Sequence, residues 1–142
     1  MSLKPRMIMF DQGSNNRGTF LGLGSTKEYI NGEKIYTAFD SPHLIKSLRN
    51  NFINPKLKFI VDEKELSWQD VLTAYDEDVK SATTRAMSKI TPSHINPNNF
   101  EKMKVRYATQ IFSRSVATGV QTTHTIKDRG SKTWKNTVWF IN

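Results

Sequence analysis

Cysteine is absent from this sequence of 142 residues. Disulfide bonds and thiolate zinc sites are therefore excluded as sources of stability or chemistry. Long apolar runs are absent too: no stretch approaches the ~20 residues of a membrane-spanning helix, and the N-terminal residues lack the apolar core of a signal peptide. We therefore expect an intracellular protein that has no membrane partner.

Acidic residues are scarce relative to basic ones, at 13 Asp and Glu against 21 Lys and Arg, and the formal net charge is +8. This excess favours polyanionic partners such as nucleic acid or nucleotide phosphates, whereas the alternative is a basic surface without a partner. Apolar residues make up only 37% of the chain. The length suffices for one compact domain, so we expect a domain with a thin core or a part that packs on something else.

The most specific feature present is a carboxylate that follows a short apolar run. Residues 6–11 predict a buried strand that ends in Asp11, and polar, turn-prone residues follow at once. A carboxylate at the C-terminal end of a buried strand is rigid and next to solvent, which suits a divalent cation. The alternative is that Asp11 caps the following turn by accepting from the amides of Ser14 or Asn15.

The rest of the first third predicts alternating helices and strands. One or two helical turns fit residues 15–23, and a strand rich in β-branched and aromatic residues fits residues 35–39. Asn31-Gly32 is a strong turn signal, so residues 28–30 are expected to form a short partner strand across a hairpin.

A helix start follows the second of these strands. Ser41 is the expected N-cap, Pro42 fits the first helical position, and Asp40 suits the positive end of the helix dipole. The pattern continues with apolar residues at helical spacing: Leu44, Ile45, Leu48 and Phe52. The order strand–helix–strand–helix indicates an α/β arrangement with an acid at the end of each strand.

Beyond residue 54 the sequence predicts mainly helices, which moves the expected fold class from α/β toward α+β. A strand is expected within residues 57–61, and then a helix with Ser67 as N-cap and Asp70 completing a capping box. The apolar stripe of this helix consists of Trp68, Val71, Leu72, Tyr75 and Val79.

The longest predicted helix begins at Asn96-Pro97, after a loop over residues 90–97. Its expected buried face consists of Phe100, Met103, Tyr107, Ile111 and Val116, and its polar face carries Lys102, Lys104, Arg106 and Arg114. Residues 121–135 are polar, basic and unpatterned. The apolar residues from Trp134 to Phe140 need cover that no predicted element supplies, so we expect the chain to end before its fold does.

Common site motifs are missing. The three histidines are too scattered for zinc, and structural hydrogen bonding or packing is the simpler interpretation of His43 and His94. Gly22-Leu23-Gly24 lacks the third glycine and the preceding strand of a dinucleotide-binding loop, and no Gly-Lys-Ser/Thr motif is present. If a nucleotide binds, it does not bind by a standard phosphate loop.

Three blocks of the sequence resemble P-element-type transposases, the family that includes the THAP-domain transposases. The segment from Asp11 to Asn16, Asp-Gln-Gly-Ser-Asn-Asn, resembles the second catalytic-aspartate segment of that family. Residues 34–51 look like the strand and helix that follow it. Residues 93–97 and the helix from Lys104 to Ala117 look like the start of the family's inserted domain. The blocks occur in the family's order over residues 7–120.

The resemblance implies a ribonuclease-H-like catalytic domain in which three carboxylates hold two Mg²⁺ ions for DNA strand cleavage and joining. A mostly helical GTP-binding domain is inserted before the last carboxylate. By this resemblance, residues 1–53 are a partial ribonuclease-H-like core, and residues 54–142 are the N-terminal part of the insertion. The residues after Val120 diverge from the family pattern.

The resemblance also assigns residues and partners. Asp11 is the second metal-binding, catalytic aspartate, and Lys102 and Lys104 are candidates for nucleotide binding because of their location. The implied cofactors are Mg²⁺ and GTP. The implied partners are transposon-end DNA, the remainder of the transposase chain and further copies of the parent, in the nucleus. Because the other two carboxylates lie outside this sequence, we expect the chain alone to be inactive.

Two alternatives stay open. One is a domesticated or truncated module that binds GTP or DNA without catalysis, which the basic residues and the missing carboxylates favour. The other is a product that does not fold stably, which the low apolar content and the uncovered Trp134 and Trp139 favour.

Overall fold

The chain divides into two compact units, residues 1–45 and 46–142, and the division falls inside one helix. The computed structural model describes residues 7–11, 13, 29–30, 33–34, 36–81, 84–127 and 131–142. The helical turns expected over residues 15–23 lie outside these ranges.

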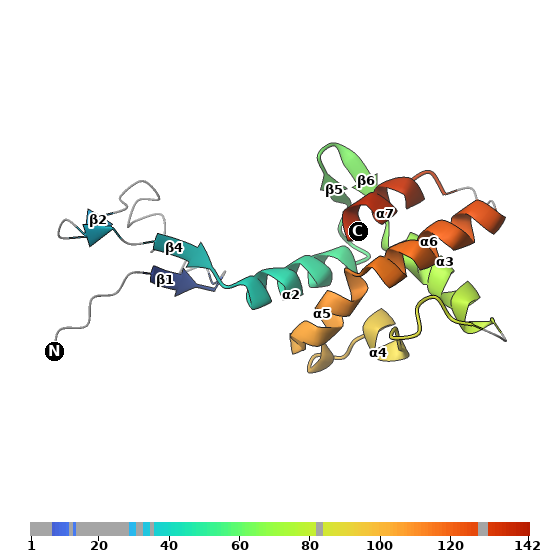
Figure 1. The fold of residues 1–142 in the computed structure, drawn as a ribbon, viewed down its shortest axis with the longest axis horizontal. Helices are drawn as coiled ribbons and strands as arrows, with labels where there is room; N and C mark the ends of the chain where they lie inside the picture. Colours follow the sequence, from blue (N-terminus) through green and yellow to red (C-terminus); the bar gives the residue numbers. More distant parts are fainter. Residues whose placement is uncertain are drawn as a thin grey trace. The chain divides into compact units, whose positions relative to one another are not determined.

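Short strands form the first unit (Figure 1). β1 (Met7–Phe10) and β4 (Tyr36–Phe39) pair in parallel, with Phe10 opposite Phe39. β2 (Tyr29–Ile30) pairs antiparallel with β3 (Glu33–Lys34). The hairpin predicted around Asn31-Gly32 is thus confirmed, but its second strand is β3. The strand predicted over residues 35–39 pairs with β1 instead.

Helix α2 (Ser41–Phe52) begins where β4 ends. The amide of Leu44 donates to the carbonyl oxygen of Asp40 at 3.0 Å, so Asp40 occupies the N-cap position and Ser41 is the first helical residue. The prediction of Ser41 as N-cap was wrong by one residue. Aspartate is as favourable as serine at an N-cap, and both residues suit a helix start.

The second unit is mostly helical. Its main helices, α3 (Trp68–Val79), α6 (Arg114–Lys127) and α7 (Trp134–Ile141), pack on one another (Figure 1). Shorter elements precede α6: α4 (Pro92–Ile95), the 3₁₀ helix η1 (Glu101–Met103) and α5 (Val105–Ile111). No helix in the described part of the chain is long and apolar enough to cross a membrane.

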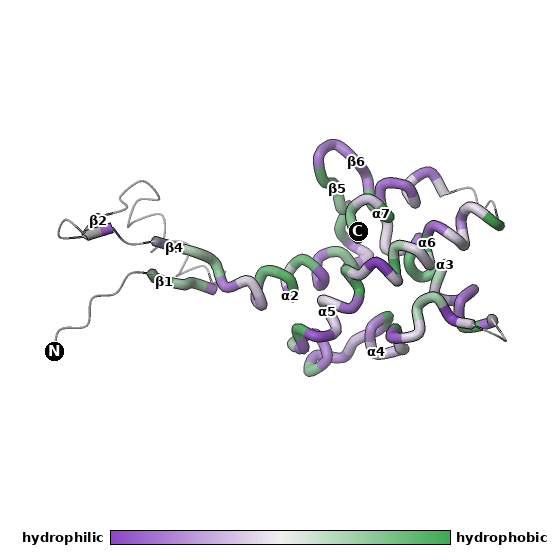
Figure 2. Tube along the Cα trace, viewed as in Figure 1, coloured by the Kyte–Doolittle hydropathy of each residue, from purple (hydrophilic) through white to green (hydrophobic). Residues whose placement is uncertain are grey.

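A hairpin that the sequence only half predicted joins α2 to α3. β5 (Phe59–Val61) pairs antiparallel with β6 (Lys64–Leu66), and the two turn residues Asp62 and Glu63 have φ of 48° and 62°. A two-residue turn with positive φ at both positions matches the twist of the strands but favours Asn-Gly or Asp-Gly. Because Glu63 stands where glycine is usual, the turn gave no clear signal. In Figure 2, β5 is coloured as hydrophobic, whereas the first part of β6 is hydrophilic.

The core of this unit draws on every main helix and on β6. Its buried members are Phe52, Leu66, Val71, Ala74, Met87, Ile90, Val116, Ala117, Val120 and Ile141. Gly119 of α6 is required here, because a Cβ atom at this position would lie 2.7 Å from Cγ of Met87. The stripe predicted for α3 is confirmed at Val71, which is buried, and at Trp68 and Tyr75, which pack on the core.

Phe140 shows that α7 completes this core. Its ring centroid lies 5.6 Å from that of Phe52, 5.4 Å from that of Phe59 and 5.7 Å from that of Phe112. Such edge-to-face and tilted arrangements are favourable for aromatic rings. The expectation that Trp134 to Phe140 lacks cover was therefore wrong. These residues form a helix that packs its own apolar side on the core.

Two further helix predictions were wrong. The single long helix from Asn96 is split, because Lys104 and Phe112 have non-helical backbones and separate η1, α5 and α6. The hydroxyl of Ser113 donates to the carbonyl oxygen of Gln110 at 2.7 Å, a local bond that competes with a continuing helix. Residues 121–135 are not unpatterned either, since α6 continues to Lys127 and α7 begins at Trp134.

Candidate functional site

Two aspartates stand at the same edge of the parallel strand pair. Asp11 follows Phe10 at the end of β1, and Asp40 follows Phe39 at the end of β4. The amide of Asp40 donates to the carbonyl oxygen of Phe10 at 2.7 Å, which extends the pairing to the start of α2. Because carboxyl ends of parallel strands meet at one edge, the structure places both acids where the sequence predicted them.

Asp11 takes part in a turn. Its Oδ1 accepts a hydrogen bond from the amide of Gly13 at 2.8 Å. This is the turn-capping role that was the alternative to metal binding, with Gly13 as the donor in place of Ser14 or Asn15. Those two residues lie outside the described ranges.

Carboxylate oxygens are the ligands that Mg²⁺ prefers, so the chemistry of this edge fits the metal. The number of ligands is smaller than a two-metal site needs. Within the described ranges, no group of three or more His, Cys, Asp or Glu side chains could hold a metal ion. The role of Asp11 as a metal ligand stays a prediction.

Lys102 and Lys104, the candidates for nucleotide binding, flank the end of η1 and are both exposed. The ammonium of Lys104 lies 5.0 Å from the centre of the Tyr107 ring. The carbonyl oxygen of Lys102 accepts a hydrogen bond from Nη2 of Arg49 at 2.8 Å. The two lysines thus lie close together in the chain on a segment that α2 anchors, and their contact with a nucleotide stays a prediction.

Arg49 itself is fully buried. Its Nε and Nη1 atoms have no hydrogen-bond partner among the residues that the structure describes. Burial disfavours the charged form and lowers the pKa of the guanidinium. Burial of a cation is energetically costly. The hydrogen bond of Arg49 to the carbonyl oxygen of Lys102 gives this side chain a role in holding the segment around Lys102.

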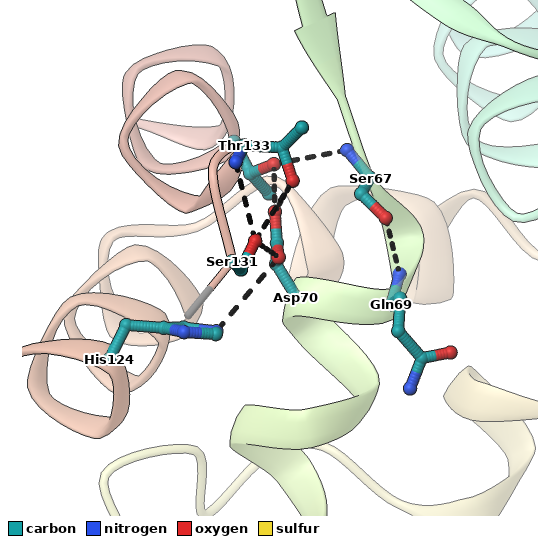
Figure 3. Close-up of polar contacts among 7 residues, drawn as sticks. Ser67, Gln69, Asp70, His124, Ser131 and Thr133 are labelled. Carbon is teal, nitrogen blue, oxygen red and sulfur yellow. Dashed lines mark hydrogen bonds and ion pairs between the residues drawn. The ribbon is translucent and has the colours of Figure 1, made fainter. Parts of the chain in front are cut away.

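The most elaborate polar arrangement was not predicted. Asp70 on α3 is 2% exposed and accepts three hydroxyl hydrogen bonds (Figure 3). Ser131 donates to Oδ1 at 2.5 Å, and Thr133 and Thr137 donate to Oδ2 at 2.8 Å each. The expected capping box is therefore wrong in its second half: Ser67 accepts from the amide of Gln69, but its own amide donates to Thr137 at 3.2 Å and not to Asp70.

His124 of α6 lies beside this carboxylate. Its Nε2 is 4.0 Å from Oδ1 of Asp70 (Figure 3). Its ring also stacks on that of Trp134, with centroids 5.9 Å apart. Neither ring nitrogen has a hydrogen-bond partner in the described part of the chain. A serine nucleophile must bond to its histidine base. Ser131 bonds to Asp70 instead, so these residues do not form a hydrolytic triad.

The arrangement around Asp70 ties the start of α7 to α3. A buried carboxylate is tolerated when its oxygens are hydrogen-bonded, and three hydroxyls meet that need here. The signal in the sequence was the hydroxyl spacing Ser131, Thr133 and Thr137, which lies in and beside the stretch interpreted as unpatterned. Spacing alone could not pair these hydroxyls with an acid more than sixty residues earlier.

His94 has a structural role, as the sequence favoured. Its Nδ1 accepts from the amide of Thr91 at 3.1 Å, which places the ring proton on Nε2, 2.8 Å from Oε1 of Gln110. The ring also contacts that of Tyr107, with centroids 4.4 Å apart. These contacts hold α4 against α5.

Three hollows among the described residues of the second unit are of nucleotide-compatible size. One of about 420 Å³ lies between the end of α3 and α6, and two of about 380 and 360 Å³ adjoin the β5–β6 hairpin and Asp70. Neither Lys102 nor Lys104 lines any of the three. The first contains Lys80 and several hydroxyls, but Glu77 and Asp78 also line it and disfavour phosphates.

The helical unit defines the class of the protein. Residues 42–142 match the family model of the TNP-like, GTP-binding insertion domain, and the chain belongs to that family. The predicted boundary between residues 53 and 54 is not tested by this match.

Two relatives agree with this assignment. The chain is 31% identical over 121 residues to the transposable element P transposase of Drosophila melanogaster, and the match covers 80% of this chain and 16% of that protein. The solved Drosophila P element transposase strand transfer complex is similar in structure, with a TM-score of 0.77 and 27% identity over 95% of this chain and 31% of that chain. The resemblance to P-element-type transposases is confirmed, for a chain that spans a minor part of its relatives.

Proposed function

We propose that this chain supplies part of the GTP-binding insertion domain of a P-element-type transposase and the part of its catalytic core that carries Asp11. The parent transposase performs GTP-dependent DNA transposition by Mg²⁺-assisted phosphoryl transfer in the nucleus. The observation that carries the proposal is the match of residues 42–142 to a GTP-binding insertion domain. The position of Asp11 at a strand end supports the catalytic part. The partners are transposon-end DNA, the remainder of the transposase chain and further copies of the parent.

Calorimetric titration of the chain with GTP tests the nucleotide part. We expect binding at one site with GTP and weaker binding with ATP, together with a higher melting temperature in the presence of GTP, because a ligand of the folded state stabilises it. Absence of both heat and a melting shift would remove GTP from the proposal.

The lysine assignment needs its own variants. If Lys102 and Lys104 hold the phosphates, Lys102→Ala with Lys104→Ala lowers GTP affinity about tenfold or more, as expected for charge-assisted contacts. The matched control replaces Lys56 and Lys89, which are exposed elsewhere in the unit. Equal affinities for the two double variants would show that the phosphates are bound by other residues.

The catalytic part predicts that the chain alone is inactive, since one catalytic aspartate cannot hold two metals. Incubation with transposon-end DNA and Mg²⁺ should give no nicking. Nicking that Asp11→Ala abolishes would contradict this expectation and would show a complete site.

A non-catalytic module derived from a transposase is the second candidate function. It is favoured by the small number of carboxylates at the strand edge and by the net charge of +8. Binding of GTP or DNA by the chain, without restoration of transposition when the chain is combined with the missing parts of a transposase, would support this candidate over the first.

A further inference from the structure

Residues 98–106, called here the basic turn, form a closed and well-anchored surface segment. The amide of Asn98 donates to Oε2 of Glu101 at 2.8 Å, and the amide of Glu101 donates back to Oδ1 of Asn98 at 2.9 Å. Backbone bonds from Lys102 to Asn98 and from Lys104 to Glu101 close the turn further, at 2.9 and 3.1 Å. The segment is therefore ordered by its own hydrogen bonds.

This ordered segment presents two large apolar side chains to water. Phe100 is 80% exposed and Met103 is 69% exposed. The sequence predicted both for the buried face of a helix. A fixed, exposed phenylalanine next to an exposed methionine is typical of a binding surface, because burial of either would have stabilised the fold.

Three cations lie in the same segment as these apolar groups. Lys102, Lys104 and Arg106 are all exposed. The one acid of the turn, Glu101, is used internally: hydrogen bonds from Ser93 and from the Asn98 amide lower the pKa of its carboxyl group. Three cations against one internally bonded carboxylate give the surface a positive charge, which complements phosphates.

The buried side chain of Arg49 also anchors the basic turn. Arg49 is buried without a carboxylate partner among the described residues, and its Nη2 donates to the carbonyl oxygen of Lys102. A buried guanidinium lies here although a well-packed apolar side chain is often more favourable. Its position accounts for this, since it fixes the backbone between Phe100 and Lys104.

From these observations we infer that the basic turn is a docking surface for single-stranded DNA. Phe100 stacks on an unpaired base, Met103 contacts the same base or its neighbour, and the cations bind the flanking phosphates. An aromatic ring amid cations is the arrangement by which proteins bind single strands. In a closed duplex the base faces are covered by stacking, which favours the single strand as occupant. This inference rests on the proposed function and assigns the DNA surface within it.

A polymer fits the turn better than a free nucleotide. Nucleotide sites are usually concave, whereas the apolar and cationic side chains of the turn are exposed on the surface. An exposed aromatic ring and three exposed cations in one short segment offer contacts to both the bases and the phosphates of a strand.

Fluorescence anisotropy with a labelled 20-nucleotide oligo(dT) and the full chain tests the inference. Phe100→Ala should lower affinity about tenfold, whereas Phe100→Tyr keeps it within about twofold, because tyrosine retains the stacking face. The matched control is Ile126→Ala, since Ile126 is 75% exposed outside the turn. Wild-type affinity of Phe100→Ala, or an equal loss for Ile126→Ala, would overturn the inference.

Salt dependence tests the cations separately. Replacing Lys102, Lys104 and Arg106 by alanine should reduce the slope of log affinity against log salt by about 2, as expected for three lost contacts to a single strand. Alanine at Lys56, Lys89 and Lys132 removes the same charge outside the turn. An equal reduction for both triple variants would assign binding to net charge alone and overturn the inference.

Three further experiments distinguish single-stranded DNA from other ligands of the basic turn. A 20-base-pair duplex should bind without sensitivity to Phe100→Ala, and an equal loss on duplex and single strand would contradict base stacking. A dimer that Phe100→Ala disperses in sedimentation would assign the surface to a second copy. Displacement of the oligonucleotide by stoichiometric GTP would assign the cations to the nucleotide, and either result overturns the inference. Loss of oligonucleotide binding by Phe100→Ala with GTP heat unchanged would support the inference independently of the nucleotide part.

Discussion

The region around Asp70 and the basic turn differ in which side chains are buried and which are exposed. Asp70 is 2% exposed, and three hydroxyls saturate its carboxylate. In the basic turn, Phe100 is 80% exposed and three cations project into water. The first region places a charge where apolar groups usually lie, and the second places apolar groups where charges usually lie.

The difference separates stability from recognition. Substitution in a saturated buried network disrupts folding, because each lost partner leaves a buried group unpaired. Substitution of the exposed side chains Phe100, Lys102 and Lys104 should leave folding nearly unchanged and should affect mainly what binds there. A variant series should therefore divide into two classes that do not overlap.

The largest effect is expected for Asp70→Asn. The amide group places two donors among three hydroxyl donors, and we expect the free energy of unfolding to fall by about 3 kcal/mol in urea denaturation. Asp76→Asn on the same helix is exposed and should change it by less than about 0.5 kcal/mol. Similar values for the two variants would show that the hydroxyl network does not stabilise the fold.

The Arg49→Met variant tests the buried side chain that anchors the basic turn. The Nε and Nη1 atoms of Arg49 have no hydrogen-bond partner among the described residues. Replacing this buried cation by an apolar side chain should leave the free energy of unfolding unchanged or raise it by about 1 kcal/mol. The amides of Met103 and Lys104 should nevertheless exchange with solvent faster, because the turn loses its anchor. Arg49→Lys, which keeps the charge without the planar fork, should be the least stable of the three proteins. A loss of about 3 kcal/mol for Arg49→Met would show that the guanidinium is a net stabiliser.

A smaller effect is expected at the β5–β6 turn, which belongs to neither region. Glu63 has φ of 62°, and glycine adopts this conformation without the steric penalty of a Cβ atom. Glu63→Gly should raise the free energy of unfolding by about 1 kcal/mol in thermal or urea denaturation. Glu65→Gly, within β6, should lower it, and the reverse order would contradict the turn geometry.

The smallest effect is expected at low pH, where the carboxylate of Glu101 becomes protonated. Hydrogen bonds from Ser93 and the Asn98 amide lower the pKa of Glu101. A carboxylate with a lowered pKa in the folded state stabilises that state above its unfolded pKa, and the contribution is lost as the pH falls through the folded pKa. The amide resonance of Asn98 should therefore titrate with a midpoint below that of an ordinary glutamate. Glu101→Gln should abolish the titration, and a midpoint at the ordinary value would mean that the turn is not closed in solution.

Local signals in the sequence predicted most helices and strands but not the breaks between consecutive helices. The strand before Asp11, the helix from residue 41 and the N-cap at Ser67 followed from capping and periodicity. The long helix from Asn96 failed because apolar spacing does not reveal that Lys104 and Phe112 leave helical conformation. Packing accounts for the break at Phe112, which joins the aromatic cluster of Phe52 and Phe140.

The polar sites differ in the same way. Asp11 was predicted because a strand and its terminal acid are adjacent in sequence. The network of Asp70 depends on Ser131, Thr133 and Thr137, and the anchoring of the basic turn depends on Arg49, which is 53 residues from Lys102. Such long-range pairings carry no periodicity, so only the folded structure reveals them.

If the basic turn binds single-stranded DNA, binding and stability reside in separate parts of residues 46–142. Two-dimensional amide NMR of the labelled chain, titrated with oligo(dT), tests it most directly. We predict shifts concentrated at residues 98–106 and unchanged resonances for Asp70, His124 and Thr137. Shifts centred on Asp70 and its hydroxyl partners, with residues 98–106 unaffected, would show that the oligonucleotide binds at the buried network and not at the basic turn.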